Sequence, residues 1–148
     1  MTQEQKYLLI KDLCSRLPYG VKVHIQSWNQ REKEQFDDVV TLQSIDRDGY
    51  IETSNEDYDS FNPEEVKPYL FPLSSMTEEQ KKDIFHNGKF YIDYHNSLCR
   101  FPMYEDDYDF VTMEDCLEIF NKLNKYHFDW RGLIPMGLAI DATGKNIY

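Results

Sequence analysis

The hydrophobic pattern at the start of the chain predicts a helix followed by a strand. Over residues 2–17, apolar side chains recur at the i, i+3, i+4, i+7 spacing of one helical stripe, made up of Ile10, Leu13, Cys14 and Leu17. A capping-box pattern at Thr2 begins the helix, and Pro18 ends it. Residues 21–27 then alternate between apolar and polar side chains, which predicts a strand with one face in the core.

Two further β-rich runs predict an antiparallel sheet. Residues 39–45 and 50–53 are separated by residues 46–49, which end in Asp-Gly, the signal of a β-hairpin. The polar stretch 29–35 is predicted to be an exposed connection. Three prolines make residues 62–76 an extended crossing that packs on the core, because proline fixes φ and removes a hydrogen-bond donor.

The second half of the chain predicts two helices around a short strand. A second capping box at Thr77 begins a short helix to about residue 86, and residues 90–94 alternate as a strand. A longer helix begins at Thr112, with acids in its first turns and bases in its last turn. The predicted buried face of this helix is made up of Met113, Cys116, Leu117, Phe120 and Leu123.

These elements predict a single α+β domain over residues 1–148, with 1–76 and 77–148 as candidate sub-halves. The expected architecture is a small twisted antiparallel sheet, with an SH3-like curl as an option. The N-terminal helix and the long helix of the C-terminal half pack against it, because so small a sheet needs a helix across one face. Leu, Ile, Val and Phe make up a quarter of the chain, which favours a folded core over disorder.

The sequence shows neither a targeting signal nor a paired-cysteine motif. The first residues lack a cationic and then apolar leader, and no run reaches the roughly 18 apolar residues of a membrane span. We therefore expect a cytoplasmic protein without membrane contact. Cys14, Cys99 and Cys116 show no C-x-x-C spacing, so no disulfide framework or zinc ribbon is predicted. Cys14 and Cys116 fall at apolar helical positions and are expected to be buried.

The charge of the chain is concentrated in two segments. The formal net charge is −11, but residues 46–65 hold eight acids and one base, and residues 101–121 hold seven acids and no base. Each segment carries −7, so the remaining 107 residues carry +3. Both segments interleave aromatic rings with carboxylates, which suits an arginine-rich partner through charge and ring stacking. Solvated loops anchored by rings would give the same pattern.

The leading functional interpretation is a non-enzymatic binding or adaptor protein that recognises a basic protein surface. The candidate binding residues are Glu56, Asp57, Tyr58, Asp59, Tyr104, Glu105, Asp106, Asp107, Tyr108 and Asp109. Direct nucleic-acid binding is not predicted, because there is no suitable Lys/Arg cluster. An acidic mimic of nucleic acid is an alternative that requires the two segments to form one continuous ridge. Homo-oligomerisation through exposed aromatic residues is a further alternative.

A small enzyme is the other alternative, with a polar site after the last helix at His127, Asp129 and Arg131. No cofactor or metal site is predicted, since phosphate-binding, hydrolase and short metal-ligand motifs do not occur. The loop 46–51 resembles the middle of an EF-hand, but Asn55 stands where the bidentate glutamate belongs. A plain hairpin turn is therefore favoured there.

Two longer stretches carry a family resemblance. The sequence VKPYLFPLSSMTEE at residues 66–79, and HFDWRGLI at residues 127–134 with its continuation to residue 140, resemble an uncharacterised family of small proteins. That family occurs in gut Bacteroidales genomes and their phages or prophages. This sequence has Pro135-Met136 where the family usually has a charged residue. The resemblance implies a bacterial cytoplasmic setting, with mobile-element cargo as one origin, and no activity.

Overall fold

The computed structural model describes residues 1–29, 34–55, 60–85, 90–92, 98–100 and 112–148 and has an α+β fold, as predicted. Its helices are α1 (Gln3–Arg16), α2 (Glu78–Ile84) and α3 (Met113–Lys125). Its strands are β1 (Lys22–Asn29), β2 (Glu34–Ile45), β3 (Ile51–Thr53), β4 (Val66–Leu70), β5 (Phe90–Ile92), β6 (Leu98–Arg100) and β7 (Ile140–Asp141). Short 3₁₀ turns lie at Leu17–Tyr19, Pro63–Glu65 and Leu73–Ser75.

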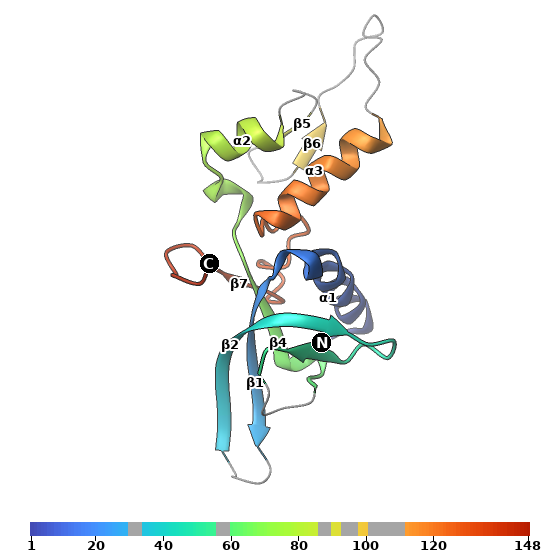
Figure 1. Ribbon diagram of the computed structural model, residues 1–148, viewed down its shortest axis with the longest axis vertical. Coiled ribbons are helices and arrows are strands. Elements are labelled where there is room, and N and C mark those ends of the chain that lie inside the picture. Colours follow the sequence, from blue (N-terminus) through green and yellow to red (C-terminus); the bar gives the residue numbers. More distant parts are fainter. Residues whose placement is uncertain (30–33, 56–59, 86–89, 93–97, 101–111) are drawn as a thin grey trace, which may run out of the picture.

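The main sheet is mixed and has the strand order β3-β2-β1-β4-β7. The pairs among β1 to β4 are antiparallel, and β7 adds to β4 as a short parallel strand, with Tyr69 opposite Ile140. The parallel pair differs from the predicted all-antiparallel sheet. It arises because the tail returns to the sheet edge only after α3, in the same direction as β4. The long β1–β2 hairpin projects beyond the other strands (Figure 1).

Two hydrophobic clusters make up the core. The first lies between the sheet and α1 and is built on Leu9, Leu13, Val23, Ile25, Phe61 and Leu70, with Leu133 and Leu138 from the tail. The second joins α2, α3 and the segment after α3 through Leu73, Met76, Ile84, Ile119, Leu123 and Phe128. Figure 1 shows α2 and α3 at one end of the molecule and the sheet at the other, with α1 between them. No helix within the described ranges is long and apolar enough to cross a membrane.

The two predicted capping boxes, at Thr2 and Thr77, are confirmed, and the helix that was predicted to begin at Thr112 has a third one. Each threonine side chain accepts a hydrogen bond from the backbone nitrogen three residues later, and the side chain of that later residue accepts one from the threonine backbone nitrogen. These caps fix the starts of α1, α2 and α3. The predicted connection 29–35 is shorter than expected, because the β1–β2 pairing continues through Asn29 and Glu34.

The predicted buried stripe of α1 is rotated. Its buried residues are Leu9, Asp12, Leu13 and Arg16, while Ile10 and Leu17 are only half-buried. Cys14 is exposed, so the prediction that it is a buried apolar residue is wrong. An ion pair on the inner face of the helix explains the difference: a pattern that counts only apolar side chains assigns two charged positions to solvent.

The predicted buried face of α3 is correct only at its C-terminal end. Leu123 is fully buried, and Phe120 and Cys116 are half-buried. Met113 and Leu117 are 77% and 56% exposed, which corrects their assignment to the core. The second cluster covers the helix only from about its middle onward, through Ile119 and Leu123.

Candidate functional site

A buried polar seam lies between the two hydrophobic clusters. Asp12 and Arg16 are one turn apart on α1 and both have 0% side-chain exposure. Arg16 Nε donates to Asp12 Oδ2 at 2.7 Å and Nη2 donates to Oδ1 at 3.0 Å. Nη2 also donates at 2.8 Å to the carbonyl oxygen of Phe128, which belongs to the second cluster. The pair therefore ties α1 to the segment after α3.

Arg131 contributes a second guanidinium to this seam. Its Nη1 donates to Asp12 Oδ1 at 3.1 Å and to Ser15 Oγ at 3.3 Å. The guanidinium lies over the Trp130 ring, with 3.9 Å from Cζ to the ring centroid. Burial lowers the pKa of Arg131, and the Asp12 carboxylate opposes that shift. Arg131 thus connects the segment after α3 to α1 through these hydrogen bonds.

His127 is held in an uncommon backbone conformation beside Arg16. Its φ is +58°, a left-handed value that histidine adopts more readily than most side chains. Its ring stacks on Tyr148, with centroids 4.1 Å apart, and the Tyr148 hydroxyl donates to the Tyr69 carbonyl at 2.7 Å. Burial, helped by the charge of Arg16, lowers the pKa of His127 to about 4. The ring is therefore neutral at physiological pH.

Asp129 organises the backbone of the tail. Its two carboxylate oxygens accept hydrogen bonds from the backbone nitrogens of Leu133 and Ile134, at 2.7 and 2.8 Å. Burial raises the pKa of Asp129, while these two hydrogen bonds act in the opposite direction. The carboxylate is a cap for a tight turn, with both oxygens engaged.

The three residues of the candidate catalytic site therefore point to different partners. His127 faces Tyr148, Asp129 faces the backbone at Leu133, and Arg131 faces Asp12. No hydrogen bond joins any two of the three in the part of the chain that the structure describes. The residues that sequence reasoning missed are Asp12 and Arg16. Their signal was available, since opposite charges at i and i+4 share one helix face with Leu9 and Leu13.

The predicted acidic binding residues cannot be placed. Glu56, Asp57, Tyr58, Asp59, Tyr104, Glu105, Asp106, Asp107, Tyr108 and Asp109 all lie outside the described residues. The described residues of segment 46–65 form the turn between β2 and β3, strand β3 and the turn before β4. The described residues of segment 101–121 form most of α3. In Figure 1, α1 separates the hairpin from α3. The described parts therefore lie on separate elements, and the continuous ridge that nucleic-acid mimicry requires stays a prediction.

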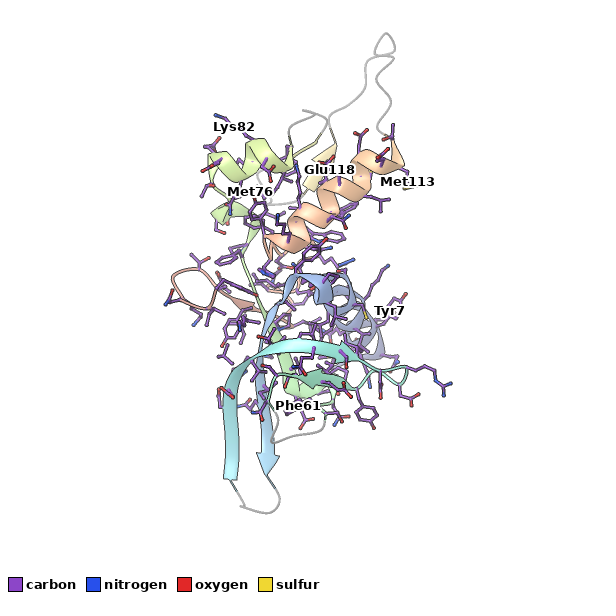
Figure 2. All side chains as sticks on the ribbon, in the orientation of Figure 1. Tyr7, Phe61, Met76, Lys82, Met113 and Glu118 are labelled. Atoms are coloured by element: carbon purple, nitrogen blue, oxygen red, sulfur yellow. The ribbon has the colours of Figure 1, made fainter. Side chains whose placement is uncertain are left out.

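A groove runs along the exposed side of α3. It has a volume of about 350 Å³ and is lined by Tyr19, Glu114, Leu117, Glu118, Asn121, Lys122 and Lys125. Met113 lies one turn before Leu117, at the N-terminal end of α3 (Figure 2). Lys122 is already engaged, because its Nζ contacts Asp83 at 3.1 Å and Glu118 at 3.2 Å. The sequence pattern did not reveal this groove, because it assigned Leu117 and the neighbouring Met113 to the core.

The loop with the EF-hand-like spacing is a hairpin turn, as predicted. Asp46 Oδ1 accepts hydrogen bonds from the backbone nitrogens of Asp48 and Tyr50, at 2.8 and 2.9 Å, which is the geometry of an Asx turn. Gly49 has a φ of +88°. No group of three or more His, Cys, Asp or Glu side chains suited to a metal ion occurs among the described residues.

Comparison with protein-family models, with curated proteins and with solved structures gave no match for this chain.

Proposed function

We propose that the protein is a non-enzymatic binding module that docks a basic, partly apolar segment of a partner protein in the groove along α3. The observation that carries the proposal is the exposure of two apolar side chains one turn apart, Met113 at 77% and Leu117 at 56%. Both stand on a helix whose opposite side is anchored in a core by Ile119 and Leu123.

Apolar contact would come from one edge of the groove. Leu117 and the half-buried ring of Tyr19 line it from α3 and from the turn after α1. Isolated exposed apolar residues are ordinary on protein surfaces, but here Leu117 and Tyr19 line a concave groove, and Met113 lies one turn before Leu117 on the same helix. A partner side chain the size of leucine inserted beside Leu117 would remove apolar area from water on both sides.

Charge indicates the chemistry of the partner. Glu114, Asp115 and Glu118 all lie in the first half of α3. The segment 101–121 that contains them carries −7 with no base. Lys122 contacts two carboxylates, and Lys125 lies in the last turn of α3, so the negative charge of the groove is concentrated at the end near Met113. Arginine or lysine on the partner would therefore lie toward Met113, with an apolar residue beside Leu117.

A second copy of this chain is a less suitable occupant. Two copies would each bring a net charge of −11, and the acidic first half of α3 would face a similarly charged surface. Like charges across an interface disfavour association and act against the apolar gain. The proposal therefore specifies a foreign basic partner. It also includes the cytoplasmic and mobile-element setting that the family resemblance implies.

A defined peptide pair tests the proposal. One helix-forming peptide carries leucine on one face with flanking arginines, and the other has glutamate in place of each arginine. Binding is measured by fluorescence anisotropy and mapped by amide chemical-shift changes. We expect the basic peptide to bind with shifts at Tyr19, Leu117 and Asn121, and to bind more weakly as salt rises. Equal binding of the acidic peptide, or shifts confined to other surfaces, would contradict the proposal.

Matched variants distinguish specific binding in the groove from non-specific association with exposed apolar side chains. Leu117→Ser should weaken binding of the basic peptide at least about tenfold, as expected for a central apolar contact. Tyr7→Ser removes a side chain of similar exposure, 66%, from α1 outside the groove lining and should leave binding unchanged. Glu114→Gln should reduce the salt dependence, and Glu64→Gln, in the other acidic segment, should not. The same loss from Tyr7→Ser and Leu117→Ser would show non-specific association.

A further inference from the structure

Two buried polar atoms in the seam lack a hydrogen-bond partner among the described residues. They are Nη1 of Arg16 and Nδ1 of His127. Arg16 has no exposed side-chain surface, and His127 is 8% exposed. A buried donor or acceptor left unpaired costs free energy, so native proteins rarely keep one without a partner or an ordered water. Both residues belong to the seam, and each of the two atoms needs a partner.

The two atoms belong to the same small region. Arg16 Nη2 donates to the carbonyl oxygen of Phe128, the residue that directly follows His127. The charge of Arg16 also contributes to the lowered pKa of His127, in agreement with this placement. Nevertheless the two groups are not hydrogen-bonded to each other, because each atom lacks any partner in this part of the chain.

We propose that Arg16 Nη1 and His127 Nδ1 hold one ordered internal water between α1 and the segment that follows α3. The water oxygen accepts a hydrogen bond from Nη1, and one water hydrogen is donated to Nδ1. Two protein partners lie within the two to four that buried waters usually have. Nδ1 then carries no proton, so the single proton of the neutral ring is on Nε2.

Charge balance favours water over a small anion. The seam contains two guanidinium groups, Arg16 and Arg131, and two carboxylates, Asp12 and Asp129. His127 is neutral above about pH 4. An anion would therefore add a buried charge with no free cation to compensate it, whereas a neutral water adds only hydrogen bonds.

The water would link α1 to His127 in the segment after α3, and through Tyr148 to the sheet. Arg16, paired with Asp12, would hold the water on the side of α1. His127 would hold it on the other side, and the His127 ring stacks on Tyr148, which contacts the sheet. The Tyr148 hydroxyl bonds to the Tyr69 carbonyl and accepts from the Lys22 nitrogen at 3.2 Å. This site is separate from the α3 groove, so it holds or fails independently of the proposed function.

Two isosteric variants of His127 test the site. Asparagine places its side-chain oxygen near the position of Nδ1, whereas glutamine extends its amide toward the position of Nε2. Oxygen-17 relaxation dispersion counts long-lived internal waters in solution. We expect the wild type and His127→Asn to share one long-lived water that His127→Gln lacks. Equal counts in all three proteins would overturn the proposal.

The wild-type protein alone gives a second measurement, which does not depend on whether either variant folds. Nitrogen-15 spectra of the His127 ring should show the proton on Nε2 and an unprotonated Nδ1 between pH 6 and 8, where His127 is neutral. A proton on Nδ1 would overturn the proposed geometry. Crystals soaked in bromide should show no anomalous peak beside Arg16, and a peak there would assign the site to an anion instead.

Discussion

Asp12 and Arg16 form a fully buried ion pair one turn apart on α1, joined by hydrogen bonds of 2.7 and 3.0 Å. The same carboxylate also accepts from Arg131, and the same guanidinium also donates to Phe128. One pair therefore connects the helix that covers the sheet with the segment that leaves α3. Its loss should affect the whole fold.

Removal of one member of this pair should be strongly destabilising. We expect Asp12→Ala to lower the free energy of unfolding by about 3–5 kcal/mol, because it leaves the buried guanidinium of Arg16 and the half-buried guanidinium of Arg131 without their shared carboxylate. Chemical denaturation monitored by circular dichroism measures this change. Glu78→Ala is the control: its 2.7 Å pair with Lys81 is exposed and should matter little. A similarly small effect at Asp12 would show that the seam is hydrated and open.

The buried imidazole should make stability depend on pH. The pKa of His127 is about 4 in the folded protein, against an ordinary value of 6.5. Between these values the unfolded chain binds a proton that the folded chain does not. Stability should therefore fall as pH falls from about 6.5 to about 4, and this contribution should then level off. Thermal or urea unfolding across this range measures it.

His127→Asn is the matched control for the pH effect, because asparagine tolerates a positive φ and does not titrate. The difference in stability between wild type and variant should shrink as pH falls from 6.5 to 4. Asp129, whose pKa is raised by burial, contributes in the opposite direction at the acidic end and is common to both proteins. A difference that is constant with pH would show that His127 is accessible to protons in the folded state.

Gly49 should be intolerant of a side chain. Its φ is +88°, and a Cβ there would lie 2.9 Å from Cδ1 of Ile10 on α1. We expect Gly49→Ala to destabilise the fold by about 1 kcal/mol or more through backbone strain and this contact. Gly144→Ala, at φ +72° with no atom within 4 Å, carries only the backbone strain. A second change, Ile10→Val, should partly rescue Gly49→Ala in the same denaturation assay.

The Asp129 cap should also be important for stability. Asp129→Ala removes the acceptor of the backbone nitrogens of Leu133 and Ile134, one of them fully buried. We expect a loss of about 1–3 kcal/mol, the usual cost of buried groups left unpaired. Asp141→Ala removes an exposed cap of Thr143 and should cost less. Hydrogen exchange should show faster exchange at Leu133 and Ile134 only in the Asp129 variant.

The elements of this fold follow closely from local sequence. The threonines at positions 2, 77 and 112 placed the starts of three helices to within a residue, two of them through predicted capping boxes. The alternation of Val21, Val23 and Ile25 placed the first strand face, and all three are fully buried. Each of these signals depends on groups only a few residues apart. They can therefore be predicted without knowledge of the rest of the chain.

The candidate site could not be predicted in the same way. His127, Asp129 and Arg131 lie within five residues of sequence, but the left-handed backbone at His127 and the turn capped by Asp129 direct their side chains apart. Conversely, Asp12 and Arg131 are far apart in sequence and meet at 3.1 Å. Side-chain direction in an irregular segment depends on contacts with distant elements, which composition and spacing do not encode.

The sequence by itself determined the α+β class, the ends of the main helices, the hairpin turn and the concentration of charge into two segments, because capping, periodicity and charge are local properties. Only the tertiary structure decided which face of each helix is buried. On α1 the inner face includes Asp12 and Arg16, since their charges satisfy each other away from water. On α3 the second cluster contains Ile119 and Leu123 but not Leu117. Leu117 and Met113, which lie nearer the N-terminus of the helix, therefore remain exposed to solvent.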